Sequence, residues 1–225
     1  MTLLTAGSKS LRPLLKSQSP HAILIGMNEK FFDLKKSKQD RMINGSLKIF
    51  TENGYRHAST DEIVSEAGIS KGLLFHYFIN KIGLFSFLYE YSTRFVLLEL
   101  HEEFRRPETD YFELQKRLTD AEASVIRLYP HMLLFLEKAD REIIPEVAEA
   151  VQACPAHVSD RYEALFEEVN YPAFLSAADA RRITDMLRMT RFGILQRSVP
   201  GALPDPDAYR EEVRACLNTL RRMTL

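Results

Sequence analysis

The sequence predicts an all-α fold. Apolar residues recur at steps of three and four along most of the chain, whereas no stretch shows the alternation that is typical of a strand. Capping residues precede several of these segments, and Gly or Pro follows them. The chain has 225 residues, of which 45% are hydrophobic and 27% charged, a composition typical of a globular protein. We expect about nine helices.

The first 36 residues are expected to form a flexible basic extension, residues 1–36. Ser, Lys and scattered Leu show no sustained period there. In this interpretation Lys30, Lys35 and Lys36 add non-specific contacts to phosphates. An alternative is that Met27 is the true start, with a short basic lead-in to the first helix.

A first helix is predicted from Ser37. Ile43, Leu47 and Phe50 recur at steps of four and three, and Gly54 supplies a stop. The second helix begins after a capping box, in which a Ser is followed three residues later by Glu. These two residues are Ser59 and Glu62.

The second helix is predicted to end at Gly68, and a third follows at about 71–78. In the third helix Leu74 and Phe78 lie four residues apart and are expected to face the core. Asn80 is expected to cap a much longer helix, which Pro107 stops near Arg106. At 1.5 Å per residue this rod is about 35 to 40 Å long, so we expect it to bridge two parts of the molecule. Its apolar stripe consists of Leu84, Leu88, Tyr91, Phe95 and Leu98.

Five further helical segments are predicted after Pro107. The segment at 144–170 is expected to be interrupted or bent at Cys154-Pro155, and Pro130 is expected at a first helical position. The apolar stripe of the last segment is expected at Tyr209, Val213, Cys216, Leu220 and Met223. The five segments cover about 110–129, 130–139, 144–170, 177–199 and 207–223.

The charge is distributed unevenly. The net charge is -1, but residues 1–81 contain 12 Lys and Arg against 7 Asp and Glu. The remainder contains 18 against 24. The amino-terminal third is therefore suited to a polyanion, whereas the rest is mildly acidic.

Several classes of protein are disfavoured. Two widely separated cysteines exclude a disulfide framework or a cysteine-based zinc site and fit a reducing cytosol. No apolar run reaches the roughly 18 residues of a membrane span. The six His show no pairing at helical spacing, and no phosphate-binding loop or nucleophile motif occurs. We expect a cytoplasmic protein that is not an enzyme and has no cofactor, no metal site and no membrane partner.

The turn Gly68-Ile69-Ser70 joins two short helices as in a helix-turn-helix. Around it, the stretch STDEIVSEAGISKGLLFHYFINKIGLF, Ser59 to Phe85, follows a matching first helix that contains IFTENGYRHAST. This region closely resembles the tetracycline-repressor (TetR) family of bacterial transcriptional regulators. The resemblance covers about 50 residues, from Ser37 to about Phe87. The rest of the chain is similar only in the number and length of its helices.

The resemblance implies a division into domains. Residues 37–96 would form a three-helix DNA-binding domain with its helix-turn-helix at about 59–78, and residues 97–225 a helical domain for effector binding and dimerisation. Residue by residue, it implies two groups of DNA contacts. Lys71, Gly72 and Leu73 would face base edges, and Thr60, His76, Tyr77 and Lys81 would hold phosphates.

The chemistry of these residues agrees with the resemblance. Gly72 weakens a helix by about 1 kcal/mol against Ala, which makes sense where the backbone must approach DNA closely. Leu73 departs from the small or hydroxylated residue usual in the family, so any base contact there is apolar. Phe75 replaces a frequent Tyr. For Lys71 and Lys81 the alternative is an ordinary solvated lysine, and for His76 a surface or packing role.

The resemblance further implies a small-molecule effector and a homodimer through the last two helices. The resulting hypothesis is a ligand-responsive repressor that binds a palindromic double-stranded DNA operator and is released by its effector. The alternative is a helical scaffold or partner-binding dimer without specific DNA binding, in which substitution of Lys71 and Tyr77 leaves activity intact. Candidate ligand contacts, each of which also fits plain core or surface, are Phe104, Tyr129, His131, Phe135, Met189 and Phe192.

Overall fold

The computed structural model describes residues 29–167, 169–171, 176–197 and 203–223. These residues form eleven α-helices and no strand, which confirms the all-α prediction. No helix in this part of the chain is both long enough and apolar enough to cross a membrane. The helices are α3 (Glu29–Phe32), α4 (Lys36–His57), α5 (Thr60–Ala67), α6 (Lys71–Phe78), α7 (Lys81–Glu103), α8 (Tyr111–Leu128), α9 (Met132–Ala139), α10 (Pro145–Gln152), α11 (Val158–Phe166), α12 (Ala177–Gln196) and α13 (Pro206–Met223).

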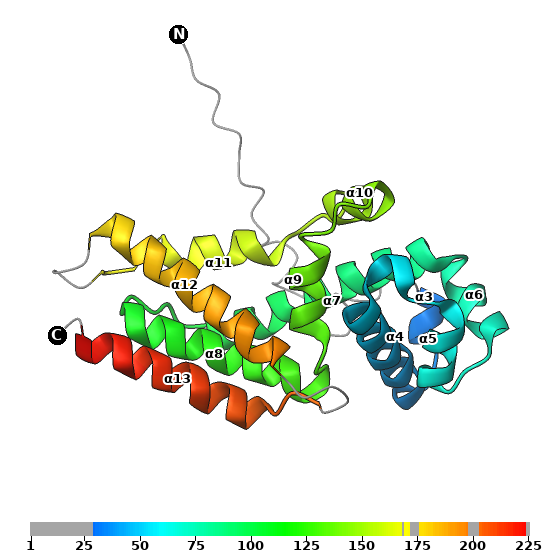
Figure 1. Ribbon diagram of the computed structural model, residues 1–225, viewed down its shortest axis with the longest axis horizontal. Coiled ribbons are helices and arrows are strands. Elements are labelled where there is room, and N and C mark those ends of the chain that lie inside the picture. Colours follow the sequence, from blue (N-terminus) through cyan, green and yellow to red (C-terminus); the bar gives the residue numbers. More distant parts are fainter. Residues whose placement is uncertain (1–28, 168, 172–175, 198–202, 224–225) are drawn as a thin grey trace, which may run out of the picture.

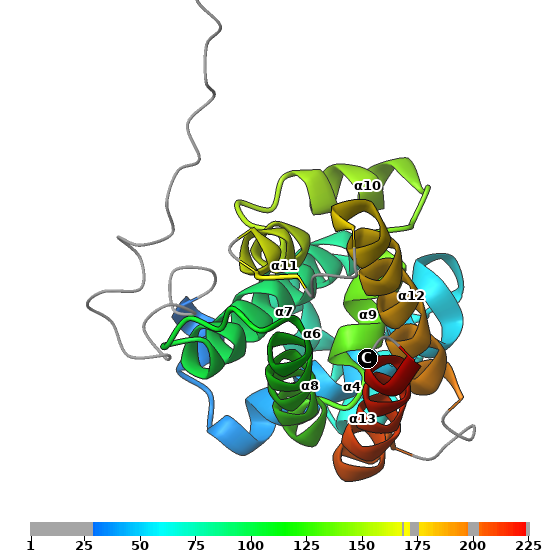
Figure 2. The same cartoon turned by 90° about the vertical axis from the view of Figure 1, so that its left-hand side faces the viewer.

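The helices form two groups along the long axis of the molecule (Figure 1). We call residues 29–80, which contain α3 to α6, the head, and the described residues from 104 onward, which contain α8 to α13, the body. Helix α7 runs from one to the other, and α9 lies beside it. The end-on view shows α10 and α11 at the top and α8 and α13 at the bottom, with α12 running between them along one side (Figure 2).

The head contains a short helix that the sequence prediction missed. Residues 1–36 were expected to be a flexible extension, but Glu29–Phe32 is helical and Phe31 is fully buried. Its ring centroid lies 4.9 Å from that of Phe87 and 5.5 Å from that of Phe78. The expectation is therefore wrong for this segment, because one phenylalanine buries enough apolar surface to hold a short helix in place. Residues 1–28, including the Met27 alternative, lie outside the described residues.

The predicted bounds of the head helices are confirmed. In α4 the regular helix breaks at Gly54, whose φ is +69°. Helix α5 ends at Gly68 with a φ of +61°, a conformation that residues with a side chain rarely adopt. Gly45 lets α4 and α5 touch, since a Cβ on it would lie 3.0 Å from the backbone nitrogen of Ala67.

The long helix α7 begins as expected at Asn80, whose side chain accepts a hydrogen bond from the Gly83 nitrogen at 2.8 Å. It continues without interruption to Glu103, so the predicted domain boundary at 96–97 falls inside it. Of the predicted stripe, Leu98 is only half-buried and the other four residues are buried. The head and the body therefore share one continuous helix.

Two details of the body differ from the prediction. The segment expected at 144–170 is two separate helices, α10 and α11, divided around Cys154-Pro155, because proline lacks the N–H that would continue the first. Pro130 does not begin α9. That helix starts at Met132 with His131 as its capping residue. This division and the extra α3 account for eleven helices where about nine were expected.

The apolar face of the last helix lies against the body itself. Tyr209, Val213 and Leu217 are buried, and α13 packs on α8. Cys216 is half-buried, and Met223 is 79% exposed. The predicted stripe is wrong at these two positions, because a 3.5-residue repeat drifts around a helix with 3.6 residues per turn. This face is consequently not available for another subunit.

Candidate nucleic-acid interface and cavity

Two capping motifs fix the helix-turn-helix in the head. The Glu62 nitrogen donates to Ser59 Oγ at 3.1 Å, and the Ser59 nitrogen donates to Glu62 Oε2 at 3.0 Å. This reciprocal pair lowers the pKa of Glu62, chiefly through the backbone hydrogen bond. After the turn, Ser70 Oγ accepts from the Leu73 nitrogen at 3.2 Å. The sequence motifs therefore set where both helices begin.

Helix α6 has one buried and one exposed side. Leu74 and Phe78 are buried, as predicted from their spacing. Lys71, Gly72 and His76 are exposed. Leu73 and Tyr77 are half-buried at the edges of the exposed side. The exposed side can therefore meet a partner without disturbing the core.

Gly72 has open space around it. Apart from the adjacent residues and the backbone of α6 itself, a Cβ built on this residue would meet no described atom within 4 Å, and its φ is not in the positive region. The fold of the described residues therefore gives no reason for glycine at this position. A partner that approaches the backbone closely would give one.

Lys71 is held by the preceding helix. Its Nζ lies 2.8 Å from Asp61 Oδ1, and both side chains are largely exposed. Exposed pairs of this kind add about 0–1 kcal/mol of stability, so the ammonium can exchange this carboxylate for another anion. Thr60 is half-buried at the first position of α5, beside the capping Ser59.

Aromatic contacts support the far end of α6. The Tyr77 ring lies edge-on to Phe31 of α3 at 5.9 Å and to His76 at 4.9 Å between centroids. Phe31 therefore positions a predicted DNA-binding residue, although sequence reasoning placed it in a flexible tail. The adjacent pair Phe31-Phe32 in a polar, Lys-rich segment was the signal that could have identified it.

Lys81 is directed toward the protein. Its Nζ donates to the Arg56 carbonyl at 3.4 Å and lies 4.6 Å from the centre of the Tyr55 ring. Partial burial lowers its pKa. The side chain joins the end of α4 to the start of α7, and a phosphate contact from Lys81 stays a prediction.

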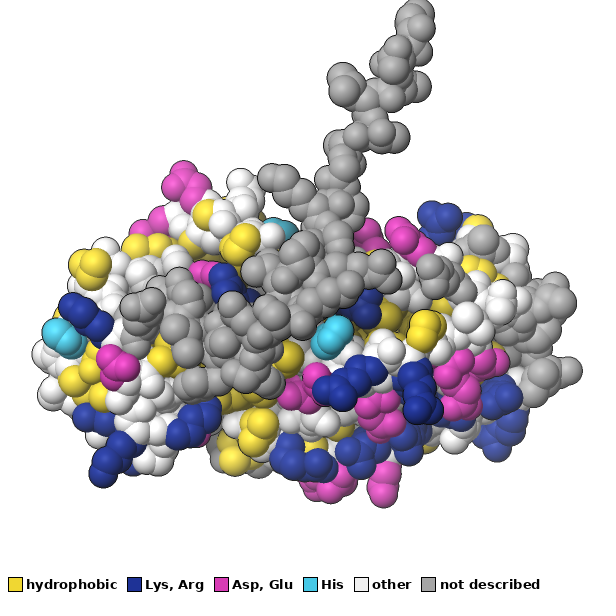
Figure 3. Space-filling model, turned by 180° about the vertical axis from the view of Figure 1, so that it is seen from behind, with side chains coloured by type: hydrophobic (Ala, Val, Ile, Leu, Met, Phe, Trp, Pro, Cys, Tyr) yellow, Lys and Arg dark blue, Asp and Glu magenta, His cyan; other side chains and the backbone are white. Residues whose placement is uncertain are grey.

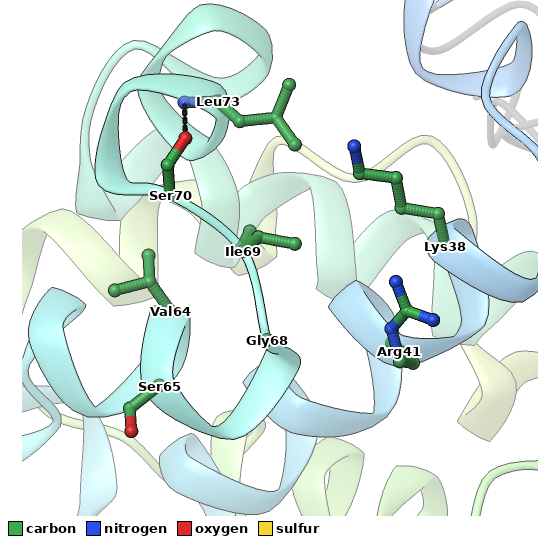
Figure 4. A pocket seen from close by; sticks show the side chains of 8 residues that line it. All are labelled: Lys38, Arg41, Val64, Ser65, Gly68, Ile69, Ser70 and Leu73. Atoms are coloured by element: carbon green, nitrogen blue, oxygen red, sulfur yellow. Dashed lines mark hydrogen bonds between the residues drawn. The ribbon is translucent and has the colours of Figure 1, made fainter.

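A hollow beside α6 contains two basic residues that the sequence prediction did not name. Lys38 and Arg41 of α4 extend toward Ile69 and Leu73 across this hollow (Figure 4). Their spacing of three residues at the start of a helix, next to the helix-turn-helix, was the available signal. Seen from behind, the charged side chains at the head end are mainly Lys and Arg, whereas both signs mix over the body (Figure 3).

Comparison with known proteins agrees with this geometry. Residues 42–86 match the family described as "Bacterial regulatory proteins, tetR family". The part of the chain around the helix-turn-helix is therefore similar to the TetR family. The matched residues contain the whole helix-turn-helix. Members of this family are DNA-binding transcriptional regulators rather than enzymes.

Individual relatives of this chain are distant. The Transposon Tn10 TetC protein of Escherichia coli is 26% identical over 110 residues, 49% of this chain and 50% of that protein. The alignment thus spans about half the length of the curated relative. A TetR family transcriptional regulator from Chloroflexus aurantiacus is 23% identical with a TM-score of 0.55, covering 86% of this chain and 96% of that one. A putative transcriptional regulator from Pseudomonas aeruginosa is 18% identical with a TM-score of 0.51, covering 85% and 94%. These two structures support the fold.

The body contains a cavity of about 780 Å³. It lies between α11 and α12, with residues of α8, α9 and α13 also in its lining. Its size is within the range of cavities that bind drug-sized molecules. Aromatic side chains in its wall are Tyr162, Phe166, Tyr171, Phe192 and Tyr209.

The structure brings only one predicted ligand residue, Phe192, to this cavity. Phe104 lies under the Arg117 guanidinium, and Met189 is 63% exposed outside the cavity. The other three, Tyr129, His131 and Phe135, lie where the body meets the head. Apolar spacing identified them as interior residues but could not tell which interior surface each one faces.

These three residues contact α4. Tyr129 Oη donates to Asp40 at 3.0 Å, and the Phe135 ring lies 6.3 Å from Phe50. The His131 carbonyl accepts from Thr51 Oγ1 at 3.5 Å. Burial raises the pKa of Tyr129 and lowers that of His131. The three residues therefore form a junction between head and body.

The floor of the cavity is a buried polar network. Glu122 and Arg191, each 7% exposed at the side chain, form an ion pair of 3.1 Å. Glu122 also accepts from Tyr209 Oη at 2.7 Å and from Tyr162 Oη at 3.2 Å. Arg191 donates to the Gln115 side chain at 2.8 Å. Burial and the Glu122 carboxylate raise the pKa of Tyr209. Sequence reasoning missed Glu122, since one acidic residue in an amphipathic helix resembles a surface residue.

Proposed function

We propose that this chain is a ligand-responsive repressor that binds a palindromic operator as a homodimer and is released by a small-molecule effector. The exposed side of α6 carries the proposal, above all the open space at Gly72. In such a complex α6 enters the major groove. Lys71, Gly72 and Leu73 would then face base edges, while Thr60, His76, Tyr77 and Lys81 lie near phosphates. We add Lys38 and Arg41 as phosphate contacts.

The proposed domains divide within α7. The head binds DNA, and the body, from the second half of α7 onward, binds the effector and the second subunit. Two recognition helices about one turn of DNA apart are needed for operator-level affinity. We propose that the subunits meet through the outward sides of α12 and α13. Met186 and Met189, which are 60% and 63% exposed on α12, are suited to this contact.

The body can influence the head through α9. One side of this helix carries the cavity residues Leu133, Leu136 and Asp140. On its other side Phe135 packs on Phe50, and Lys138 Nζ donates to the Thr51 carbonyl at 2.7 Å. An effector that prefers one position of α9 would bias the position of α4 and lower operator affinity by its differential affinity for the two states.

The test is binding to the DNA that flanks the coding region. An inverted repeat from that region is titrated with the purified chain at moderate salt, where non-specific phosphate attraction is suppressed. We expect specific binding with one dimer per repeat, and an affinity about tenfold lower for Lys71→Ala. An absence of specific binding would contradict the proposal.

The same titration examines the rival function. If the chain is a scaffold or partner-binding dimer without DNA recognition, Lys71→Ala and Tyr77→Phe leave its activity intact. Tyr77→Phe retains the ring that packs on Phe31 and removes only the hydroxyl. A fall in operator affinity with unchanged dimerisation supports DNA recognition over the scaffold.

A further inference from the structure

We propose that the cavity in the body binds amphipathic organic cations. The inference rests on the proposed function in one respect, because it names the chemical class of the proposed effector. The binding itself can be measured without DNA. Three features of the cavity carry the inference: the balance of charge in its lining, the commitment of its buried arginine, and its aromatic wall.

Carboxylates outnumber basic groups in the lining. Six acidic and three arginine side chains line the cavity, and no lysine is among them. The acidic residues are Glu122, Glu137, Asp140, Glu163, Glu167 and Asp185, and the basic ones are Arg181, Arg188 and Arg191. A ligand with a positive charge is therefore attracted by the lining as a whole.

Ion pairs within the protein do not remove this imbalance. Glu122 is neutralised by Arg191, and Glu137 by Arg141, which lies outside the lining. What remains is four carboxylates against the guanidinium groups of Arg181 and Arg188. These two arginines and the four carboxylates are all exposed, so water weakens the attraction of both signs alike and the carboxylates remain in excess.

An anionic ligand has no buried positive group to meet. Arg191, the buried arginine of the lining, already bonds Glu122, Gln115 and Thr119. Replacing the Glu122 carboxylate with that of a ligand would leave Glu122 buried without its partner, which is costly. The network therefore disfavours anions while leaving the other carboxylates able to attract cations.

The carboxylates lie beside aromatic rings. Glu163 lies on α11, and Glu167, one turn further on, is the residue that caps its end. Tyr162 directly precedes Glu163, and Phe166 directly precedes Glu167. All four side chains line the cavity. Phe192 on the opposite helix, α12, also lines it, and the Arg141 guanidinium already lies 4.8 Å from the centre of its ring. Aromatic faces attract cations and also bury apolar groups. The ligand class that matches both properties is a bulky organic cation.

Asp140 provides a further carboxylate at the α9 end of the cavity. It accepts a hydrogen bond from Tyr89 Oη at 2.5 Å, and burial raises its pKa. A cation bound beside it would replace lost solvation and favour the ionised form. Since α9 also contacts the head, a ligand bound at this end of the cavity would act on α4 through α9.

Two probes of matched shape and opposite charge test the proposal. Tetraphenylphosphonium and tetraphenylborate are each titrated into the full chain by calorimetry, in sodium buffer and without DNA. We expect the phosphonium to bind at least about tenfold more tightly. Equal affinity for the two ions, tighter binding of the borate, or binding of neither would overturn the proposal.

Charge-neutral variants locate the site. Glu163→Gln alters an exposed side chain in the lining, and Asp140→Asn keeps an acceptor for Tyr89, so neither should impair folding. Each is expected to weaken phosphonium binding by about three- to tenfold. Glu211→Gln, which removes an exposed carboxylate from α13 outside the lining, is the control and should leave binding unchanged. An equal effect of all three variants would overturn the proposal.

The operator assay separates this inference from the proposed function. If the phosphonium binds in the cavity but does not change operator affinity, the ligand class stands and release by this effector class fails. If operator binding is specific but neither ion binds the chain, the DNA-binding function stands and the ligand class fails.

Discussion

The head and the body handle their polar groups in opposite ways. In the head the capping side chains and Lys71 lie at the surface, with Leu74 and Phe78 behind them. In the body Glu122 and Arg191 are buried together under a cavity. The head therefore exposes its polar side chains to a partner outside the fold, whereas the body buries its own. A substitution in the buried network of the body should chiefly change stability, and one on the exposed side of the head should chiefly change binding.

The largest effect is expected at Arg191. Arg191→Met leaves Glu122 buried without its ion-pair partner, which should lower the free energy of unfolding by about 3–5 kcal/mol. Urea unfolding measures the loss. Adding Glu122→Gln to the same chain should recover part of it. The control Arg182→Met, which breaks an exposed pair with Asp179, should leave the midpoint unchanged. If Arg191→Met and Arg182→Met lowered the unfolding midpoint by similar amounts, the proposed difference between buried and exposed ion pairs would be contradicted.

Gly83 should show the next largest effect. A Cβ at this position would lie 2.3 Å from the Phe78 carbonyl oxygen, where the chain turns from α6 into α7. Ile79 already adopts a positive φ of 63° in that turn. Gly83→Ala should therefore cost about 1–3 kcal/mol, read from thermal unfolding. Unchanged stability would mean that this turn relaxes easily.

Lys71 should affect binding without affecting stability. Lys71→Ala removes only an exposed ion pair, so the unfolding midpoint should stay within error. Operator affinity should fall by about tenfold, because base contacts contribute about 1–3 kcal/mol each. Lys48→Ala is the matched control, since it also breaks a lysine–carboxylate pair between head helices, that of Lys48 with Glu66. Equal losses of affinity in the two variants would indicate a general charge effect.

The smallest expected effect is the pH dependence of stability that comes from His131, at the junction between head and body. Burial lowers the pKa of His131, so the unfolded chain takes up a proton near pH 6.5 while the folded chain resists it. The unfolded state then binds more protons, and stability falls as the pH drops below about 6.5. Between pH 7 and 5 the wild-type chain should lose up to about 1 kcal/mol more than His131→Gln. Denaturant titrations measure both stabilities. Equal losses of stability in the wild-type chain and His131→Gln over this pH range would contradict the prediction.

Sequence predicted the head far better than the body. Helix starts at Ser59, Ser70 and Asn80 depend on residues three positions away, so local patterns determine them. The small helix around Phe31 was missed because its stability comes from Phe78 and Phe87, far along the chain. Long-range packing leaves no such periodic signal.

Long-range packing also explains why the sequence did not predict the cavity. Its lining combines residues from α8, α9, α11, α12 and α13, and spacing along one helix cannot show which neighbour it faces. Tyr129 and Phe135 were correctly expected to be interior, yet they lie at the junction with α4. Glu122 could not be separated from surface acids without knowing that Arg191 lies opposite.

The most direct test of the central claim is the operator affinity of Gly72→Ala, measured beside its stability. Apart from the adjacent residues and the backbone of α6 itself, no atom of the described residues lies within 4 Å of the added Cβ, so stability should be unchanged or higher by up to about 1 kcal/mol. If the backbone at this position approaches DNA, the same methyl group should weaken operator binding at least about tenfold. Undiminished operator affinity in a folded Gly72→Ala chain would contradict the assignment of this side of α6 to DNA.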